Sequence, residues 1–272
     1  MAQTLELLTH RTGTMRSIRG IVRTMKTMSA INALPYEQAA EAMAAYRATV
    51  LEGFHAFVQC NGPLPVEADH DAAPVVIAFG SDHGLCGNYN EIVAAEAAEV
   101  AGQTPAARVI CIGAQMEDAL IGQGISPKMT LLPPANVDGL GRLAGRLITL
   151  LDDMRRAGST GSIAVSLVSM QRAAHAHQRP VSHRLLPLDP RMTDALAQRP
   201  WTSRSLPWFS LPPDRLLAAL IRSYLFAEMF RAAAEALVTE NAARLARMQQ
   251  AEQFIDERLE ELTTEMRAVR QS

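Results

Sequence analysis

The sequence contains few cysteines: only three of its 272 residues. Cys60, Cys86 and Cys111 are an odd number without regular spacing, so they predict no disulfide framework and fit a reducing compartment. The N-terminus, MAQTLELLTHR, lacks the apolar core of a signal peptide. No apolar run approaches the roughly 18 residues of a membrane span. We therefore expect a cytoplasmic chain without direct membrane insertion.

An excess of one charge sign is also missing, because 26 Lys and Arg residues stand against 28 Asp and Glu residues. The composition thus predicts no general attraction to nucleic acid. The two signs are nevertheless separated along the chain. Five basic residues and no acidic one lie between residues 11 and 36, whereas acidic residues gather between 252 and 265. This separation predicts either pairing between the two ends or different partners for each.

Glycine is absent from residues 211–272, and Pro213 is the last proline. Positions that alternate by three and four from Leu217 to Val269 are apolar except at Arg231, Asn241 and Glu252. A heptad pattern of this length is typical of a coiled coil, so it predicts a long helix over 211–272.

The N-terminal residues 1–59 repeat this pattern, with the same alternation from Leu8 to Phe57, although Arg11, Ser29, Asn32 and Gly53 break it. Pro35 removes a helical hydrogen bond, but the alternation continues in register on both sides of it, which predicts a bend and not an end. Because each end of the chain has an apolar seam, we expect the two helices to form one antiparallel coiled coil.

Between the two helices, apolar runs alternate with helical stretches. This pattern predicts a Rossmann-like α/β domain over 74–190 with a mostly parallel sheet, followed by an extended connector over 191–210. The expected strands are 75–79, 108–112, 128–132, 163–169 and 181–188, and the expected helices are 92–101, 114–121 and 138–156.

The segment FGSDHGLCGNYNE, residues 79–91, joins the first strand to the first helix of this domain. A glycine loop in that position is where phosphates are often bound. A phosphate-binding loop, however, needs Lys-Ser/Thr after its last glycine, and here Asn88 follows Gly87. A dinucleotide fingerprint needs a third glycine that is missing. We therefore interpret the segment as a tight turn without a cofactor.

Two groups of side chains offer other chemistry. Cys86 and His83 are a possible nucleophile and base, but no third group orients the histidine, so a structural cysteine is the favoured interpretation. His175, His177 and His183 are possible metal ligands, but no Cys, Asp or Glu accompanies them between residues 159 and 188. We expect neither a catalytic residue nor a metal site.

Three segments resemble the gamma subunit of F-type ATP synthases. Residues 16–28, RSIRGIVRTMKTM, resemble its N-terminal helix, and residues 81–87, SDHGLCG, resemble its S-D-x-G-L-C-G loop. Residues 223–248 resemble its C-terminal helix. The segments follow the order of the family, and the resemblance covers essentially the whole chain.

The resemblance implies a central rotor stalk that couples ion translocation through the membrane sector to ATP synthesis or hydrolysis. Its coiled coil would stand inside the hexamer of alpha and beta subunits, and its α/β domain would lie near the ring of membrane subunits and the epsilon subunit. The subunit itself would bind no nucleotide and catalyse no reaction. Its place would be the cytoplasmic face of the bacterial inner membrane.

By the same resemblance, one set of residues contacts the beta subunit: Arg16, Arg19, Arg23, Met25, Lys26, Glu240, Asn241, Arg244, Arg270 and Gln271. A second set forms the turn that faces lower beta or epsilon: Asp82, Gly84, Leu85, Cys86 and Gly87. The basic residues 16, 19, 23 and 26 are expected beside seam positions 15, 18, 22 and 25, so their charges should face solvent or a partner.

The sequence departs from the family pattern in two ways. It stops at Ser272, soon after Arg270-Gln271, so the tip that the resemblance places in the upper bearing of the hexamer is expected to be short or missing. Pro35 and a less typical N-terminal helix indicate a divergent branch, such as the alternative sodium-linked ATPases. Two other classes stay open from the residues alone. They are a stand-alone α/β nucleotide-binding enzyme that dimerises through its helices, and a coiled-coil structural adaptor.

Overall fold

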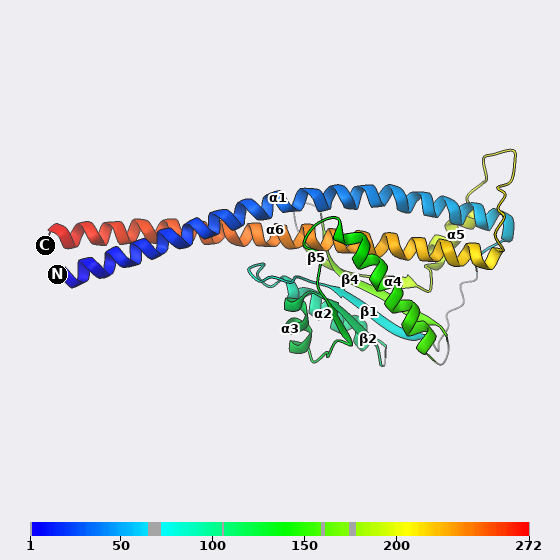
Figure 1. Ribbon diagram of the computed structural model, residues 1–272, viewed down its shortest axis with the longest axis horizontal. Helices are drawn as coiled ribbons and strands as arrows, with labels where there is room; N and C mark the ends of the chain where they lie inside the picture. The colour runs from blue at the N-terminus through cyan, green and yellow to red at the C-terminus, as the bar shows by residue number, and fades with distance from the viewer. Residues whose placement is uncertain (1, 65–71, 105, 159–160, 174–177, 272) are drawn as a thin grey trace.

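The computed structural model describes residues 2–64, 72–104, 106–158, 161–173 and 178–271. Two long helices lie side by side, and both termini lie at the same end of the pair (Figure 1). Helix α1 spans Ala2–Asn61 and helix α6 spans Pro213–Gln271. The long antiparallel helix pair predicted from the sequence is confirmed.

The seam of α6 is as expected, since every position of its ladder from 217 to 269 is buried or half-buried. For α1, only half of the predicted seam positions are correct. Every seventh position from Leu8 to Phe57 is buried or half-buried, but Ile18 and Tyr46, expected between them, are exposed. The residue after each predicted position faces α6 instead: 12, 19, 26, 33, 40, 47 and 54.

The error has a physical cause. An apolar seam can advance along a helix by three residues and then four, or by four and then three. Both alternations include the same every-seventh residues and differ only in the residue between them, so both fit the helical repeat. The apolar side chains of Ile18 and Tyr46 favoured the first alternation. The true seam contains Arg19 and Lys26 because acidic residues of α6 lie opposite them.

The corrected register predicts which cysteine pair crosslinks. The hydroxyl of Thr12 lies 3.5 Å from the sulfur of Met266 across the seam. We expect the double variant Thr12→Cys/Met266→Cys to form a disulfide within one chain under mild oxidation. Ile18→Cys/Met266→Cys is the matched control and should not, because Ile18 faces outward. Gel mobility without reductant measures the result; crosslinks between chains only would contradict an intramolecular pair.

Helix α1 continues through Pro35 without interruption. Pro35 lies on the exposed side of the helix. The backbone carbonyl that loses its hydrogen bond there can be hydrated, which is how helices tolerate an internal proline.

The sheet of the α/β domain has the order β3-β2-β1-β4-β5. Four strands are parallel, and β5 pairs antiparallel with β4 at the edge. The strands are β1 (Ala73–Phe79), β2 (Arg108–Ile112), β3 (Met129–Leu131), β4 (Ile163–Arg172) and β5 (Gln178–Leu186). The predicted mostly parallel sheet is confirmed.

Helices cover both faces of this sheet. Helices α2 (Tyr89–Gly102) and α3 (Ala114–Gly122) pack on one face, over Val76, Ala78 and Cys111. Helix α4 (Gly139–Ala157) and the middle of α6 pack on the other face, over Ile77 and Ile110. The long helix α6 is therefore part of the core of the α/β domain, which fixes the domain to the helix pair.

The extended connector predicted over 191–210 is partly wrong, because Pro190–Gln198 form helix α5. Asp189 caps the helix by accepting a hydrogen bond from the backbone N–H of Arg191. Pro190 occupies the first turn, where proline is favoured. The Asp189-Pro190 pair therefore starts a helix. Leu196 of this helix packs against the end of α1 and the start of α6.

Candidate functional site

The residues predicted to contact partners lie in or beside two regions. The first is the shaft, defined as residues 2–33 of α1 and 245–271 of α6; its two chain ends project beyond the α/β domain (Figure 1). At 1.5 Å per residue the α6 part extends about 40 Å. The second is the glycine turn, residues 80–88, where the α/β domain meets α6.

Ion pairs join the two helices of the shaft. Glu252 accepts from Arg23 at 2.6 Å and from Lys26 at 2.5 Å, and only 14% of its side chain is exposed. Arg19 pairs with Asp256 at 2.7 Å. The expectation that these basic residues lie beside the seam and face outward is therefore wrong for Arg19 and Lys26, which lie on the seam half-buried. The basic residues near the N-terminus and the acidic residues near the C-terminus therefore pair with each other at these positions.

The two basic partners lower the pKa of Glu252 to about 2, first through the hydrogen bond from Lys26 and then through that from Arg23. Because the folded pKa lies below the ordinary 4.5, the ion pair stabilises the fold above about pH 4.5. That contribution is lost as the pH falls through about 2.

We expect Glu252→Gln to melt at a lower temperature than the parent chain at neutral pH, with the difference shrinking steadily below about pH 4.5. Glu261→Gln is the control, since Glu261 is 59% exposed in its pair with Arg258 and contributes little. Thermal melts at stepped pH measure both. A difference for Glu252→Gln that stays constant from neutral to acidic pH would contradict the ion-pair account.

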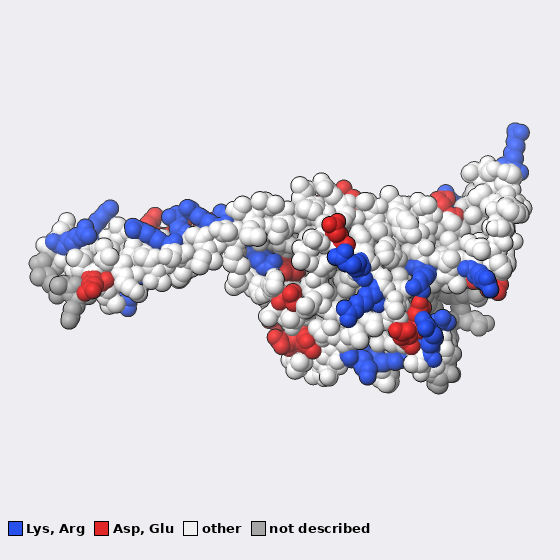
Figure 2. Space-filling view, viewed as in Figure 1, with Lys and Arg blue, Asp and Glu red and all other residues white. Residues whose placement is uncertain are grey.

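At the end of the shaft, side chains from both helices form a basic groove. Arg16 lines it from α1, and Arg267 and Arg270 line it from α6. Figure 2 shows basic side chains along the projecting helices. The structure thus brings together Arg16 and Arg270 from the predicted set. Gln271 lies exposed beside the groove, whereas Met25 packs inward against Val22 and Met248.

The glycine turn is held by buried hydrogen bonds. The Asn90 side chain accepts from the backbone N–H of Ser81 at 2.8 Å and donates to the Ser81 hydroxyl at 2.7 Å. Leu85 and Gly87 have positive φ, 66° and 69°. The turn interpretation is correct, but a leucine takes one of the left-handed positions and Gly84 does not. Such a position costs a leucine energy, so the surrounding contacts must fix the turn.

Cys86 and His83 do not form a catalytic pair. The Cys86 thiol is buried and lies within hydrogen-bond distance of the Ser81 hydroxyl and the backbone oxygen of His83. The imidazole of His83 is 82% exposed and lies near Asp82. The base therefore points to solvent while the thiol points inward, as the structural interpretation of this cysteine predicts.

Arg244 of α6 closes the glycine turn. Its guanidinium donates to the backbone oxygens of His83 and Gly84 at 3.2 and 3.3 Å, and to Glu240 at 2.5 Å. Burial raises the pKa of Glu240, and Arg244 opposes that rise. Asn241 donates to the backbone of its own helix. All three residues, predicted to contact a partner, are buried. Arg244 binds the turn to α6, and Glu240 pairs with it.

This contact occupies the place where α/β folds most often bind ligands. The strand order of the sheet reverses between β1 and β4, and ligands usually lie beyond the carboxyl ends of the strands at such a point. Here the turn after β1 is closed by Arg244 and also contacts Arg247, which lies 2.3 Å from where a Cβ on Gly87 would be. The site is filled by the protein's own helix.

The predicted histidine cluster is only partly within the structure. His175 and His177 lie outside the described residues, and His183 is on β5. Among the described residues, no group of three His, Cys, Asp or Glu side chains is placed to hold a metal ion. None of the described helices is long and apolar enough to cross a membrane.

A two-helix stalk that carries an α/β domain near its middle is the class of protein that this fold defines. Solved structures share it. The rotor of the Euglena gracilis mitochondrial ATP synthase aligns with a TM-score of 0.68 at 15% identity, over 100% of this chain and 99% of that one. The central stalk and c-ring structure from Tetrahymena thermophila aligns with a TM-score of 0.60 at 16% identity, over 85% and 99%.

Sequence comparison is more specific. The ATP synthase gamma chain of Saccharopolyspora erythraea is 25% identical over 291 residues, covering 100% of this chain and 93% of the relative. That of Maricaulis maris is 24% identical, covering 98% and 94%. A family model described as ATP synthase matches residues 4–272. The chain belongs to this ATP synthase family, and the relatives it matches along its length are gamma chains.

Proposed function

We propose that this chain is the central rotor stalk of an F-type ATP synthase. The observation that carries the proposal is the projecting shaft, a stiff pair of helices with both chain ends at its tip, in a chain that matches gamma chains over its full length. Rotation of the shaft would transmit torque between the membrane ring and a hexamer of alpha and beta subunits. The stand-alone enzyme and the adaptor are not favoured by these relatives.

The shaft is the part proposed to enter the hexamer. Its basic groove at Arg16, Arg267 and Arg270 would contact acidic surfaces of the beta subunits. The outward side of α1 also has exposed apolar residues, Ile21 and Met28 among them. Exposed apolar side chains in such number mark a contact surface. Arg244, which is paired with Glu240, would act indirectly, by fixing the glycine turn to α6. Asn241 is also buried, with its side-chain hydrogen bond inside α6, so it would not contact beta directly.

The opposite end is proposed to meet the membrane ring. Residues 199–212 form a loop that projects there (Figure 1). Trp208 is 87% exposed and Leu206 is 67% exposed, which is unusual for large apolar residues in a solvated loop. The ring subunits or the epsilon subunit would cover them, with the exposed Leu85 of the glycine turn as a second contact for epsilon.

In this proposal the chain is a non-catalytic, peripheral subunit at the cytoplasmic face of the bacterial inner membrane. The buried thiol of Cys86 and the filled ligand position of the sheet support the absence of chemistry in the subunit itself. Catalysis would belong to the beta subunits.

Co-purification with charge-reversed variants tests the proposal. The tagged chain, produced with the other subunits of its complex, should recover alpha and beta in threefold excess. Replacing Arg16, Arg267 and Arg270 by glutamate should reduce that recovery severalfold while the melting temperature changes little, because exposed charges contribute weakly to folding. Replacing the exposed Arg142 and Arg146 of α4 by glutamate is the control. Full recovery by the triple variant would contradict a role for the groove.

A further inference from the structure

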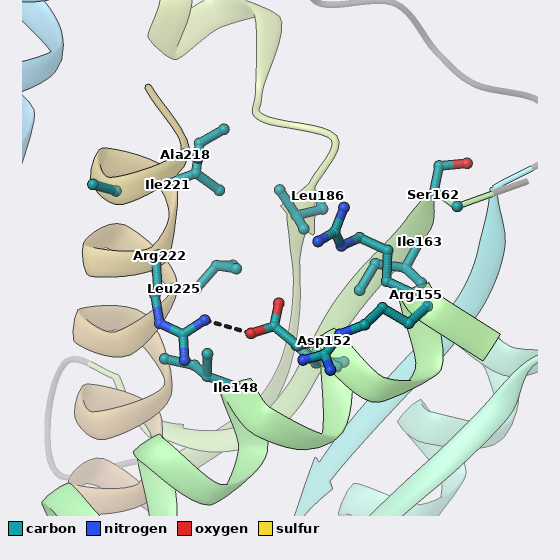
Figure 3. A pocket seen from close by; sticks show the side chains of 14 residues that line it. Ile148, Asp152, Arg155, Ser162, Ile163, Leu186, Ala218, Ile221, Arg222 and Leu225 are labelled. Atoms are coloured by element: carbon teal, nitrogen blue, oxygen red, sulfur yellow. Dashed lines mark hydrogen bonds and ion pairs between the residues drawn. The ribbon is translucent and has the colours of Figure 1, made fainter. Parts of the chain in front are cut away.

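A cavity of about 570 Å³ lies where the α/β domain meets the helix pair (Figure 3). It is bounded by α4, α6, the start of β4 and the end of β5. Ile148, Leu151 and Leu225 form a buried apolar floor. Ile163 and Leu186 continue the apolar lining toward the opening. Its volume is within the roughly 300–1,000 Å³ of pockets that hold small ligands.

The rim of the cavity is cationic. Three arginines, Arg155, Arg156 and Arg222, surround the opening with a single acid, Asp152. Asp152 pairs with Arg222 across the cavity, as the dashed line in Figure 3 marks. Arg156 is 3.7 Å from Asp153 on its own helix. Arg155 has no ion-pair partner within the part of the chain that the structure describes.

We propose that this cavity binds a single-chain amphipathic carboxylate. Its alkyl chain would pack on Ile148, Leu151 and Leu225, and its carboxylate would accept hydrogen bonds from Arg155 and Arg222. An apolar floor excludes a ligand that is polar throughout, and a rim with two more positive than negative charges excludes an amphipathic cation. Arginine is the side chain best matched to a carboxylate, because its planar donors fit the two oxygens.

Ligand binding in this cavity would affect the contact between α4 of the α/β domain and α6. The ion pair between Asp152 and Arg222 connects α4 of the α/β domain to α6. A bound carboxylate competes with Asp152 for the same guanidinium. The ligand therefore binds more tightly when Asp152 loses its charge, a result that a purely apolar cavity does not give.

Calorimetric titration of the full-length chain with hexanoate, octanoate and decanoate, each below its micelle concentration, tests the proposal. Each buried methylene should tighten binding by up to about fourfold, until the cavity is filled. Decyltrimethylammonium has a similar chain with the opposite charge and should not bind. Absence of saturable carboxylate binding, or equal binding of the cation, overturns the proposal.

Variants localise the binding. Arg155→Gln should weaken decanoate binding about tenfold or more, and Asp152→Asn should strengthen it severalfold, whereas Arg146→Gln on the same helix should change nothing. Ala218→Phe narrows the cavity from an exposed position of α6 and should abolish binding; Ala246→Phe, exposed elsewhere on α6, is its control. Melting temperatures establish that each variant folds. Unchanged affinity in Arg155→Gln and Ala218→Phe overturns the assignment. A third result also overturns it: the parent chain binds no carboxylate, and Ala218→Phe prevents recovery of a protein partner. The cavity would then be a protein contact.

Discussion

Replacing Gly113 by alanine should lower the free energy of unfolding by about 3 kcal/mol or more, one of the two largest effects that the structure predicts. Gly113 lies between β2 and α3 with φ at +108°, a conformation that side chains rarely permit. A Cβ there would lie 2.4 Å from the backbone oxygen of Ser81, and backbone cannot move aside as a flexible side chain can. The substitution thus strains the chain and displaces the start of the glycine turn.

Gly141→Ala is the matched control. Gly141 lies within α4, and an added Cβ would meet no atom within 4 Å. Alanine there should stabilise the chain by about 0.5–1 kcal/mol, because glycine is a poor helix former. Urea unfolding followed by circular dichroism measures both variants. Equal stability of Gly113→Ala and the parent chain would show that the turn is not constrained as the structure has it.

Glu228→Ala should also destabilise the fold, by about 3 kcal/mol. The Glu228 carboxylate is only 1% exposed and pairs with Arg47 of α1 and, at 2.9 Å, with Arg231 of its own helix. Burial alone would raise its pKa, but the hydrogen bond from Arg47 and the charge of Arg231 hold the pKa below its usual value. Removing the carboxylate leaves two cations facing each other near the apolar Phe54 and Tyr224 cluster. Both arginines are about one third exposed, which limits the cost.

The comparison for Glu228 is Glu261→Ala, whose pair with Arg258 is exposed on α6. We expect a change within about 0.5 kcal/mol for that variant. A double-mutant cycle with Arg47→Ala separates the pair from its surroundings. If Glu228→Ala and Glu261→Ala melt alike, the buried ion pair does not hold α1 to α6.

The sequence allowed the architecture to be predicted because the strongest patterns were the longest ones. The ladder of α6 left no alternative to a long helix, and strands alternating with helices imposed a mostly parallel sheet. The short Asp189-Pro190 start of α5 was hidden among prolines, which are equally typical of an extended connector. Its signal was present, since an N-cap followed by proline begins a helix.

The candidate site was harder to predict because a residue type does not reveal where its side chain points. The sequence predicts an outward basic face that includes Arg19 and Lys26, but charged side chains also occupy a seam when acids oppose them, as Glu252 and Asp256 do here. Arg244 was expected at an external contact, yet its partners are backbone oxygens of the glycine turn, 160 residues away in sequence. Such distant contacts leave no local pattern in the chain.

The proposed rotation of this chain inside the complex can be tested directly through its exposed thiol. Cys60 is exposed at the end of α1, whereas Cys86 and Cys111 are buried. A biotin maleimide should therefore label Cys60 selectively and carry a bead, with the alpha and beta hexamer fixed to a surface. On addition of ATP we predict continuous rotation of the bead in one direction, with pauses at thirds of a turn set by the three pairs of subunits. A bead that stays still while the same immobilised complexes hydrolyse ATP would contradict the rotor function.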